Sequence, residues 1–526
     1  MALITVKADE LERLSGVKPG KFEELLTAIG VPLERNEGGE LDLEITPNRP
    51  DLLSVEGVAR ALKGFETGAV PKYKAEKSDF KAAVDTSVQK VRPFLGMAVA
   101  TGITIDGDFL KSLISLQEKL HDTLGRKRKK VAIGVHDGSK IQFPLTYKAV
   151  PKKAISFVPL DMAEKMTPEE ILAKHPKGID YAHLVKDMCP VIVDAKGDVL
   201  SFPPIINGEL TRVGVGTKDI ILDVTGISKE AVMKTLNILA CAFADRGATI
   251  HSVDVGGEIC PHLEPEEMEY PSALCESLLG LKLKEPERKS YLAKMGFAYS
   301  KGKVLVPPYR TDIISGIDIV EDIAIAHGLN NFARTLPNFF TPGKLDTSYD
   351  AAHRAMAGMG YLECSGWILT SAKKEAGAGL DPAKGLPISN RLTEDFSHVR
   401  QSIIPNLLEV LSISKNQAYP QKIYEIGPVW AGKGTETRLA GAITHHKASF
   451  SEMKSALKSL FYEIGAEFEA KPMKEGNPAY IGGRCAAIWA NGKCIGSFGE
   501  AHPQSLNNFN LEKPVCIFEM DIDKAL

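Results

Sequence analysis

The sequence has few cysteines, and those it has are not arranged in pairs. Eight are scattered over 526 residues, and none shows the C-x-x-C spacing of a zinc ribbon. Scattered positions also give no framework for disulfides, so we expect reduced, mostly buried thiols of the kind found in the cytosol. This pattern argues against a structural zinc site and against a small disulfide-stapled secreted protein.

Long hydrophobic runs and a strong charge of one sign are also missing. No stretch of about 18 residues is apolar throughout, and the first residues, MALITVKADELERL, lack the apolar core of a signal peptide. These features predict a soluble, cytoplasmic protein with no membrane partner. The net charge of −3 excludes a surface that is basic all over, so RNA would have to bind through a local patch.

The chain is long enough for several domains. Its 526 residues predict about three to four domains with real cores. Apolar residues make up 44% and charged residues 25%, as in an ordinary globular protein. Helical and strand patterns are mixed along the whole chain, so the predicted fold class is multidomain α+β.

The densest group of acidic oxygen ligands lies in VPPYRTDIISGIDIVEDIAIAHGL, residues 306–329. Its four acids are Asp312, Asp318, Glu321 and Asp322. The last three stand at i, i+3 and i+4 and share one face of a helix, while Ser315-Gly316 can bend the first toward them. Crowded carboxylates favour a hard divalent ion. The alternative is that they complement the helix dipole and face solvent.

A second candidate site lies at the end of the strand IILDVTG. Asp223 and Thr225 alternate along it and therefore point to the same side, and Ser228 can cap the helix that follows. Strand ends of α/β sheets often border pockets. The alternative is that both side chains bond to backbone amides of the turn.

The run GRKRKK, residues 125–130, is the main basic patch. Such a run usually forms a solvated face, and the functional alternative is a surface that contacts phosphates. His136-Asp137, just after it, is a weak hint of a metal phosphohydrolase, because no second histidine cluster supports it.

Several stretches resemble the β subunit of phenylalanyl-tRNA synthetase in its archaeal and eukaryotic form. The most specific are TPNRPDLLSVEG, ILDVTG, the RTD and DIVED pair, and FGEAHP, and GRKRKKVAIGVHD is typical of the same form. The resemblance implies that the four acids bind Mg²⁺. It also implies an (αβ)₂ heterotetramer in which a separate α subunit uses ATP to attach phenylalanine to tRNA(Phe).

The resemblance further implies an editing pocket that hydrolyses mischarged Tyr-tRNA(Phe). Leu200, Asp223 and Thr225 match the family's editing module position by position, and Asn207 lies where its polar loop should be. Gly208 offers no side chain where some relatives have Ser.

The resemblance also divides the chain into four domains. They are an N-terminal α/β domain (1–75), an α/β editing domain (90–260), a winged-helix-like metal-binding domain (266–336) and a class II synthetase-like antiparallel domain (343–526). Residues 71–90 are a predicted linker with a strand toward its end. The last domain lacks active-site motifs: Gly482-Gly483-Arg484 leads into a strand, where a working ATP site needs an arginine ahead of a helix.

Two other functions remain open at this point. One is a free-standing Mg²⁺ hydrolase acting on phosphates through the acids at 312–322. The other is a non-enzymatic tRNA-binding scaffold subunit that has lost editing.

Overall fold

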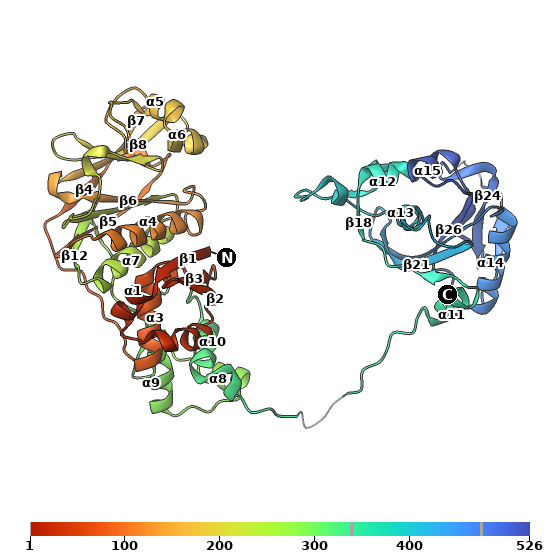
Figure 1. Cartoon of the computed structure of the whole chain (residues 1–526), viewed down its shortest axis with the longest axis horizontal. Helices are drawn as coiled ribbons and strands as arrows, with labels where there is room; N and C mark the ends of the chain where they lie inside the picture. The colour runs from red at the N-terminus through yellow and green to blue at the C-terminus, as the bar shows by residue number, and fades with distance from the viewer. Residues whose placement is uncertain (1, 337–340, 474–476) are drawn as a thin grey trace. The chain divides into compact units, whose positions relative to one another are not determined.

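A computed structural model describes residues 2–336, 341–473 and 477–526. The chain divides into two compact units, residues 1–336 and 337–526, and each mixes helices with several β-sheets (Figure 1). The fold therefore mixes helices with several β-sheets in more than one domain, in agreement with the coarse prediction of a multidomain α+β protein. Every described helix is too short or too polar to cross a membrane.

The chain begins with a three-stranded antiparallel sheet of order β1-β3-β2, associated with three helices. The elements are β1 (Ala2–Lys7), α1 (Ala8–Ser15), α2 (Phe22–Ala28), β2 (Leu33–Glu37), β3 (Glu40–Ile45) and α3 (Val55–Thr67). Alternate residues of β3 are buried, as its pattern ELDLEI predicts. Gly30, with φ of 76°, lies just beyond α2, and Ser54 caps α3 by accepting from the Gly57 amide.

A large mixed sheet follows, with the order β10-β9-β8-β7-β4-β12-β5-β11-β6 and with β13 paired to β12. The strands are β4 (Lys81–Val84), β5 (Phe94–Thr101), β6 (Val131–Asp137), β7 (Leu145–Pro151), β8 (Met188–Val193), β9 (Val199–Phe202), β10 (Ile206–Asn207), β11 (Ile220–Gly226), β12 (Thr249–Val255) and β13 (Glu258–Cys260). Its helices are α4 (Gly107–Asp122), α5 (Pro168–Lys174), α6 (Pro176–Tyr181) and α7 (Lys229–Asp245).

The predicted domain start at residue 90 falls inside this sheet and needs correction. The expected strand near the end of the linker is β4, and it pairs in parallel with both β7 and β12. β4 has only four residues and lies in a polar stretch, so its sequence did not indicate a strand in the middle of a sheet. The prediction around IILDVTG is better met, because β11 leads into α7 and Ser228 accepts from the Ala231 amide.

The first unit ends in a small sheet, β14-β16-β15, with three helices. The elements are β14 (Glu266–Glu269), α8 (Ser272–Leu279), α9 (Glu285–Lys294), β15 (Ala298–Ser300), β16 (Lys303–Val306) and α10 (Gly316–His327). Residues 300–303 form a hairpin turn between β15 and β16, with positive φ at Lys301 and Gly302. This layout positions the acids of residues 312–322 on and before α10.

The second unit is built on a seven-stranded sheet of order β17-β21-β22-β26-β25-β24-β23, and a small sheet β18-β20-β19 lies beside it. The strands are β17 (Leu362–Glu363), β18 (Leu369–Thr370), β19 (Leu386–Pro387), β20 (His398–Val399), β21 (Gln421–Trp430), β22 (Thr435–Thr444), β23 (Glu469–Lys471), β24 (Tyr480–Ala490), β25 (Lys493–Ala501) and β26 (Val515–Asp521). The helices are α11 (Asp350–Gly358), α12 (Ala372–Gly377), α13 (Ile404–Ile413), α14 (Phe450–Glu463) and α15 (Pro503–Asn508).

The main sheet of this unit is antiparallel except for the β17–β21 pair. A turn at Asn491-Gly492 joins β24 to β25, with φ of 50° and 74° at the two residues, as a type I′ turn requires. Residues 482–484 lie inside β24, so Gly482-Gly483-Arg484 does lead into a strand rather than a helix.

Candidate functional site

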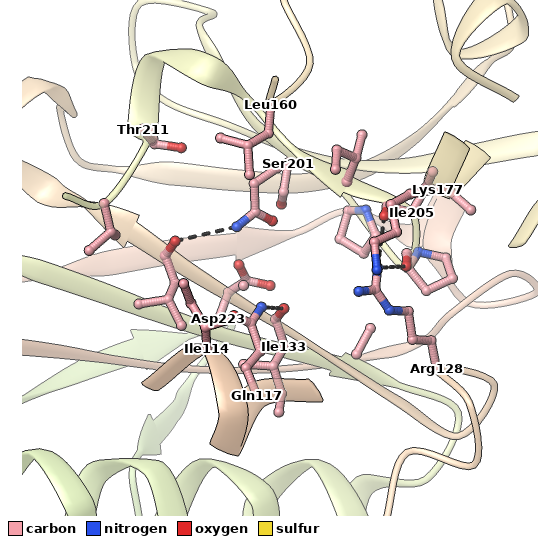
Figure 2. A pocket seen from close by; sticks show the side chains of 18 of the residues that line it. Ile114, Gln117, Arg128, Ile133, Leu160, Lys177, Ser201, Ile205, Thr211 and Asp223 are labelled. Carbon is pink, nitrogen blue, oxygen red and sulfur yellow. Dashed lines mark hydrogen bonds between the residues drawn. The ribbon is translucent and has the colours of Figure 1, made fainter. Parts of the chain in front are cut away.

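A cavity of about 320 Å³ lies in the first unit, between α4, the strands β6 and β11, and the segment that joins β9 to β10. Its walls combine apolar side chains with a few polar groups, the composition of small-molecule sites. Figure 2 shows these side chains, with Asp223 and Thr211 on one side of the view and Arg128 on the other. Asp223, Thr225 and Asn207, three of the four residues predicted for the editing pocket, line this space.

Asp223 is held by a neighbouring histidine that the sequence did not single out for this purpose. Its side chain is only 2% exposed, and Asp223 Oδ2 lies 2.7 Å from His136 Nε2. Asp223 faces Gly134 across the β6–β11 pair, and a Cβ at Gly134 would lie 1.9 Å from that oxygen. A glycine at this position is therefore required for the carboxylate and the imidazole to meet. Oδ1 of Asp223 carries no hydrogen bond to the described part of the chain.

Thr225 is fixed by a buried arginine. Arg92 donates from Nε to Thr225 Oγ1 (2.9 Å) and from Nη2 to the Thr225 carbonyl (2.8 Å). Burial lowers the pKa of Arg92 to about 10, which still leaves the guanidinium charged at neutral pH. Since the Thr225 oxygen accepts from Arg92, its own hydrogen remains available to a ligand. Neither Asp223 nor Thr225 bonds to a backbone amide of the turn among the described residues, so that alternative is wrong.

Leu200 does not line the cavity, although it was predicted in the pocket. Adjacent residues of a strand point to opposite faces, and Ser201 is the one on the cavity side of β9. Leu200 instead packs into the main core of the unit, and its carbonyl accepts from the Gly208 amide (2.7 Å). Asn207 lines the cavity and donates to the Val135 carbonyl (3.3 Å).

The basic run at residues 125–130 is split between the cavity and the surface. Arg126, Lys127 and Arg128 all have positive φ, which turns the chain so that Arg128 alone is buried. Arg128 bonds to the Ile205 carbonyl (2.9 Å) and to Glu118 (2.9 Å) at the cavity wall. The interpretation of residues 125–130 as a solvated face is therefore wrong for Arg128.

Glu118 carries the negative charge at this end of the cavity. The His121 ring, with Nδ1 3.7 Å away, and the Arg128 guanidinium hold the pKa of Glu118 at about 2, well below its usual range. Lys177 approaches the same carboxylate to 3.8 Å. This end of the cavity thus holds one more positive than negative charge, which suits an anionic group.

The four acids predicted to bind Mg²⁺ do not come together in one site. Arg310, with a side chain only 2% exposed, donates to Asp312 (2.7 Å) and to Asp322 (2.6 Å). Asp318 accepts from the amides of residues 314 and 315 at the start of α10, and Glu321 is exposed. A guanidinium thus takes the place between two of the carboxylates, and the described residues contain no group of three metal-ligating side chains.

The segment around Arg310 packs against the turn TPNRPD and the helix α3, which lie more than 200 residues earlier in the sequence. Arg49 forms a two-bond ion pair with Asp51 (2.9 Å for both bonds) in the turn TPNRPD. Arg60 contacts the Asp51 carbonyl (3.5 Å) and lies 3.8 Å from the centre of the Tyr309 ring. The space left among these groups measures about 20 Å³. These groups are closely packed, and the ion pair of Arg49 with Asp51 is part of them.

Family models match the chain in two places. The tRNA synthetase B5 domain matches residues 268–329, and the phenylalanyl tRNA synthetase beta chain CLM domain matches residues 334–522. Both models describe parts of aminoacyl-tRNA synthetases, and the chain is a protein of that class.

Relatives of full length narrow the class to one family. The chain is 42% identical to the phenylalanine–tRNA ligase beta subunit of Archaeoglobus fulgidus, over 99% of this chain and 98% of the relative. It is 41% identical to that of Methanocaldococcus jannaschii, over 99% and 100%. An N-terminal fragment of the Pyrococcus horikoshii beta subunit superposes with a TM-score of 0.59 at 40% identity, covering 62% of this chain and 99% of the fragment. The chain belongs to the family of phenylalanine–tRNA ligase beta subunits.

Proposed function

We propose that this chain combines with an α subunit to attach phenylalanine to tRNA(Phe), and that its own cavity hydrolyses mischarged Tyr-tRNA(Phe). The observation that carries the editing role is Asp223, a buried carboxylate in a cavity of about 320 Å³ with one oxygen free of protein hydrogen bonds. A free acceptor oxygen in such a place suits a ligand that brings a hydroxyl or an amine.

Editing answers a real difficulty in recognising phenylalanine. Tyrosine differs by one hydroxyl, and an apolar pocket rejects an added hydroxyl by only about a hundredfold. A second site that bonds to that hydroxyl can remove the wrong ester. Asp223 accepts from the phenol or from the amine, while Thr225 and the backbone of residues 203–208 position the ester and a water. The water adds to the ester carbonyl, the bond to the ribose oxygen breaks, and tyrosine and tRNA leave.

The second unit supports the view that activation belongs to the α subunit. It has a cavity of about 650 Å³, and the arginine in it, Arg438, is paired with Glu519 (3.2 Å) and Glu436 (3.3 Å). Adenylate formation needs cations that are free to hold the phosphates of ATP. An arginine neutralised by two carboxylates cannot hold them as strongly, so we assign phenylalanine and ATP to the partner.

An exposed apolar surface on the second unit supports association with that partner. Leu362 and Trp367 are 70% and 75% exposed, and Ile368 and Leu369, which follow Trp367 in the sequence, are also exposed. Large apolar groups gathered at a surface are typical of protein interfaces. We propose that this surface contacts the α subunit in the (αβ)₂ heterotetramer, and that the assembly works in the cytoplasm.

The binding of Mg²⁺ by the acids of 312–322 stays a prediction. Their arrangement here does not fit a common four-carboxylate site, because Asp312 and Asp322 are bonded to Arg310. Mg²⁺ usually keeps several waters and takes only one or two carboxylates from a protein. Of the four predicted ligands, only Asp318 and Glu321 are not paired with an arginine among the described residues.

Co-expression with a candidate α subunit tests the proposal. We expect the complex to charge tRNA(Phe) with phenylalanine and to release tyrosine from Tyr-tRNA(Phe), and we expect the single chain to be unable to charge tRNA. Charging by the single chain would contradict the assignment of activation to the partner. A complex that binds and charges tRNA but never releases tyrosine would instead identify a scaffold subunit that has lost editing.

A further inference from the structure

We infer that His136 is a positioning residue that keeps one oxygen of Asp223 free of hydrogen, so that the cavity selects an ester carrying a hydroxyl donor. The inference rests on the proposed editing function and names the origin of its specificity. Asp223 would bind the substrate, and His136 would act only through Asp223.

The histidine is built into the sheet next to the carboxylate. His136 is fully buried, and its two ring nitrogens lie 2.8 Å from Thr211 Oγ1 and 2.7 Å from Asp223 Oδ2. Gly134 makes the contact possible, since a Cβ there would lie 2.6 Å from His136 Nε2. The three side chains come from β6, β11 and the turn after β10, so the carboxylate is held by a fixed frame.

The position of the shared proton follows from counting hydrogens. Two lone pairs cannot face each other at 2.7 Å, so a proton lies between His136 Nε2 and Asp223 Oδ2. Thr211 has one hydroxyl hydrogen, which goes either to His136 Nδ1 or to a backbone carbonyl, that of Gly208 at 3.2 Å or that of Leu200 at 3.4 Å. If it goes to a carbonyl, Nδ1 carries a hydrogen and donates to Thr211. The proton beside Oδ2 is present in both cases.

The consequence is the same for every arrangement of these protons. Oδ2 is engaged by His136, and Oδ1 carries no hydrogen, whether the pair is charged or neutral. Oδ1 can therefore only accept. A tyrosyl ester has a phenolic hydroxyl to donate, whereas the side chain of a phenylalanyl ester has nothing to offer, and a buried acceptor left unpaired is unfavourable. Selection of the tyrosyl ester follows.

Kinetics of ester hydrolysis test this role. The complete chain with its α subunit would be assayed on Tyr-tRNA(Phe) and Phe-tRNA(Phe), as wild type, His136→Leu, His136→Gln and His136→Asn. The glutamine amide nitrogen is as many bonds from the backbone as Nε2, so it can still donate to Asp223, while asparagine is too short. His251→Leu is the control, because His251 bonds to Thr101 (2.8 Å) in the same sheet but does not line the cavity.

We expect His136→Leu and His136→Asn to lower the preference for the tyrosyl ester at least tenfold, mainly through a higher KM for Tyr-tRNA(Phe). His136→Gln should restore most of the preference, and His251→Leu should leave it unchanged. Equal losses on both esters, or an unchanged preference in His136→Asn, would overturn the inference and leave editing intact. If His136→Leu does not fold, the glutamine–asparagine pair decides. Wild-type protein without tyrosyl release would overturn the editing proposal and this inference together.

Discussion

Two buried groups of charged residues in the first unit differ in what they leave free. Around Asp223, one carboxylate oxygen has no hydrogen-bond partner within the described ranges of the chain, and the side chain borders a cavity of about 320 Å³. Around Arg310, two carboxylates share one guanidinium, and the small space of about 20 Å³ beside the adjacent Tyr309 is lined by other residues. The first group has room and an unused acceptor oxygen for a ligand, whereas both carboxylates of the second group are already paired with Arg310.

This difference separates function from stability. Crowded acids made residues 306–329 the most conspicuous part of the sequence, yet the structure pairs half of them with arginine. A buried ion pair tolerates no loss of one partner, because the other charge is then buried alone. We therefore expect changes near Arg310 to act on stability and changes near Asp223 to act on ester hydrolysis.

The largest expected effect is that of Arg310→Ala on stability. The substitution leaves the buried Asp322 and the partly buried Asp312 without their cation, so the free energy of unfolding of the first unit should fall by about 3–5 kcal/mol. Urea unfolding monitored by circular dichroism measures it. Arg212→Ala is the matched control, since Arg212 pairs with Asp161 and Glu209 at the surface and should matter by about 0–1 kcal/mol. If the two substitutions lowered the free energy of unfolding equally, the buried Arg310 pairs would be no more important for stability than a surface ion pair.

A smaller effect is expected from Thr225→Val, which should lower both the stability of the first unit and the rate of tyrosyl ester hydrolysis. The valine cannot accept from Arg92 Nε, so a buried guanidinium N–H loses its partner at a cost of about 1–3 kcal/mol in unfolding free energy. Release of tyrosine should slow as well, because Thr225 lines the cavity. Urea unfolding and a deacylation assay on the same preparation separate the two losses. If the variant is destabilised but its deacylation rate is unchanged, Thr225 contributes to stability and not to ester hydrolysis.

Acid should weaken the contribution of Glu118 to stability by a modest amount. The pKa of Glu118 is lowered to about 2 in the folded protein, so its stabilising effect is present above its unfolded pKa of about 4.3 and disappears as the pH falls toward 2. The side chain is 42% exposed and screened by solvent, so the effect should be below about 1 kcal/mol. Wild type and Glu118→Gln should therefore differ in unfolding free energy at pH 6 and converge below pH 3. A gap that widens with acid would contradict the assignment.

Removal of Mg²⁺ should have the smallest effect on the isolated chain. Because Arg310 already neutralises Asp312 and Asp322, EDTA should change the Tm by less than about 1 °C, a difference that corresponds to a few tenths of a kcal/mol. Differential scanning calorimetry with EDTA and with added MgCl₂ gives the answer. A Tm that falls by several degrees in EDTA would show that a bound divalent ion contributes much more to stability than the Arg310 pairs leave room for.

Local patterns in the sequence predicted part of the cavity. Alternation along a strand placed Asp223 and Thr225 on one side of β11, and both side chains line the cavity. The same rule of alternation could have corrected Leu200, since its neighbour Ser201 faces the cavity and Leu200 must then face the core. The family resemblance gave the position, but the strand pattern decides the direction of the side chain.

Pairings between distant segments could not be predicted. His136 and Asp223 are 87 positions apart, and their contact depends on β6 lying beside β11, which no local pattern specifies. The partner of Asp312 and Asp322 was present in the predicted motif as Arg310, but spacing alone cannot tell a guanidinium between carboxylates from a metal ion. Charge patterns predict that acids will meet a cation, and only the structure identifies it.

The most direct test of the account is the preference of the full complex for Tyr-tRNA(Phe) over Phe-tRNA(Phe), measured as the ratio of kcat/KM for deacylation in wild type and in Asp223→Asn. The wild type should strongly favour the tyrosyl ester. In Asp223→Asn that ratio should fall about tenfold or more, as expected from the loss of a hydrogen bond to a charged group worth about 1.5–3 kcal/mol, while charging with phenylalanine stays intact. An unchanged ratio in Asp223→Asn would contradict the assignment of this cavity as the editing site.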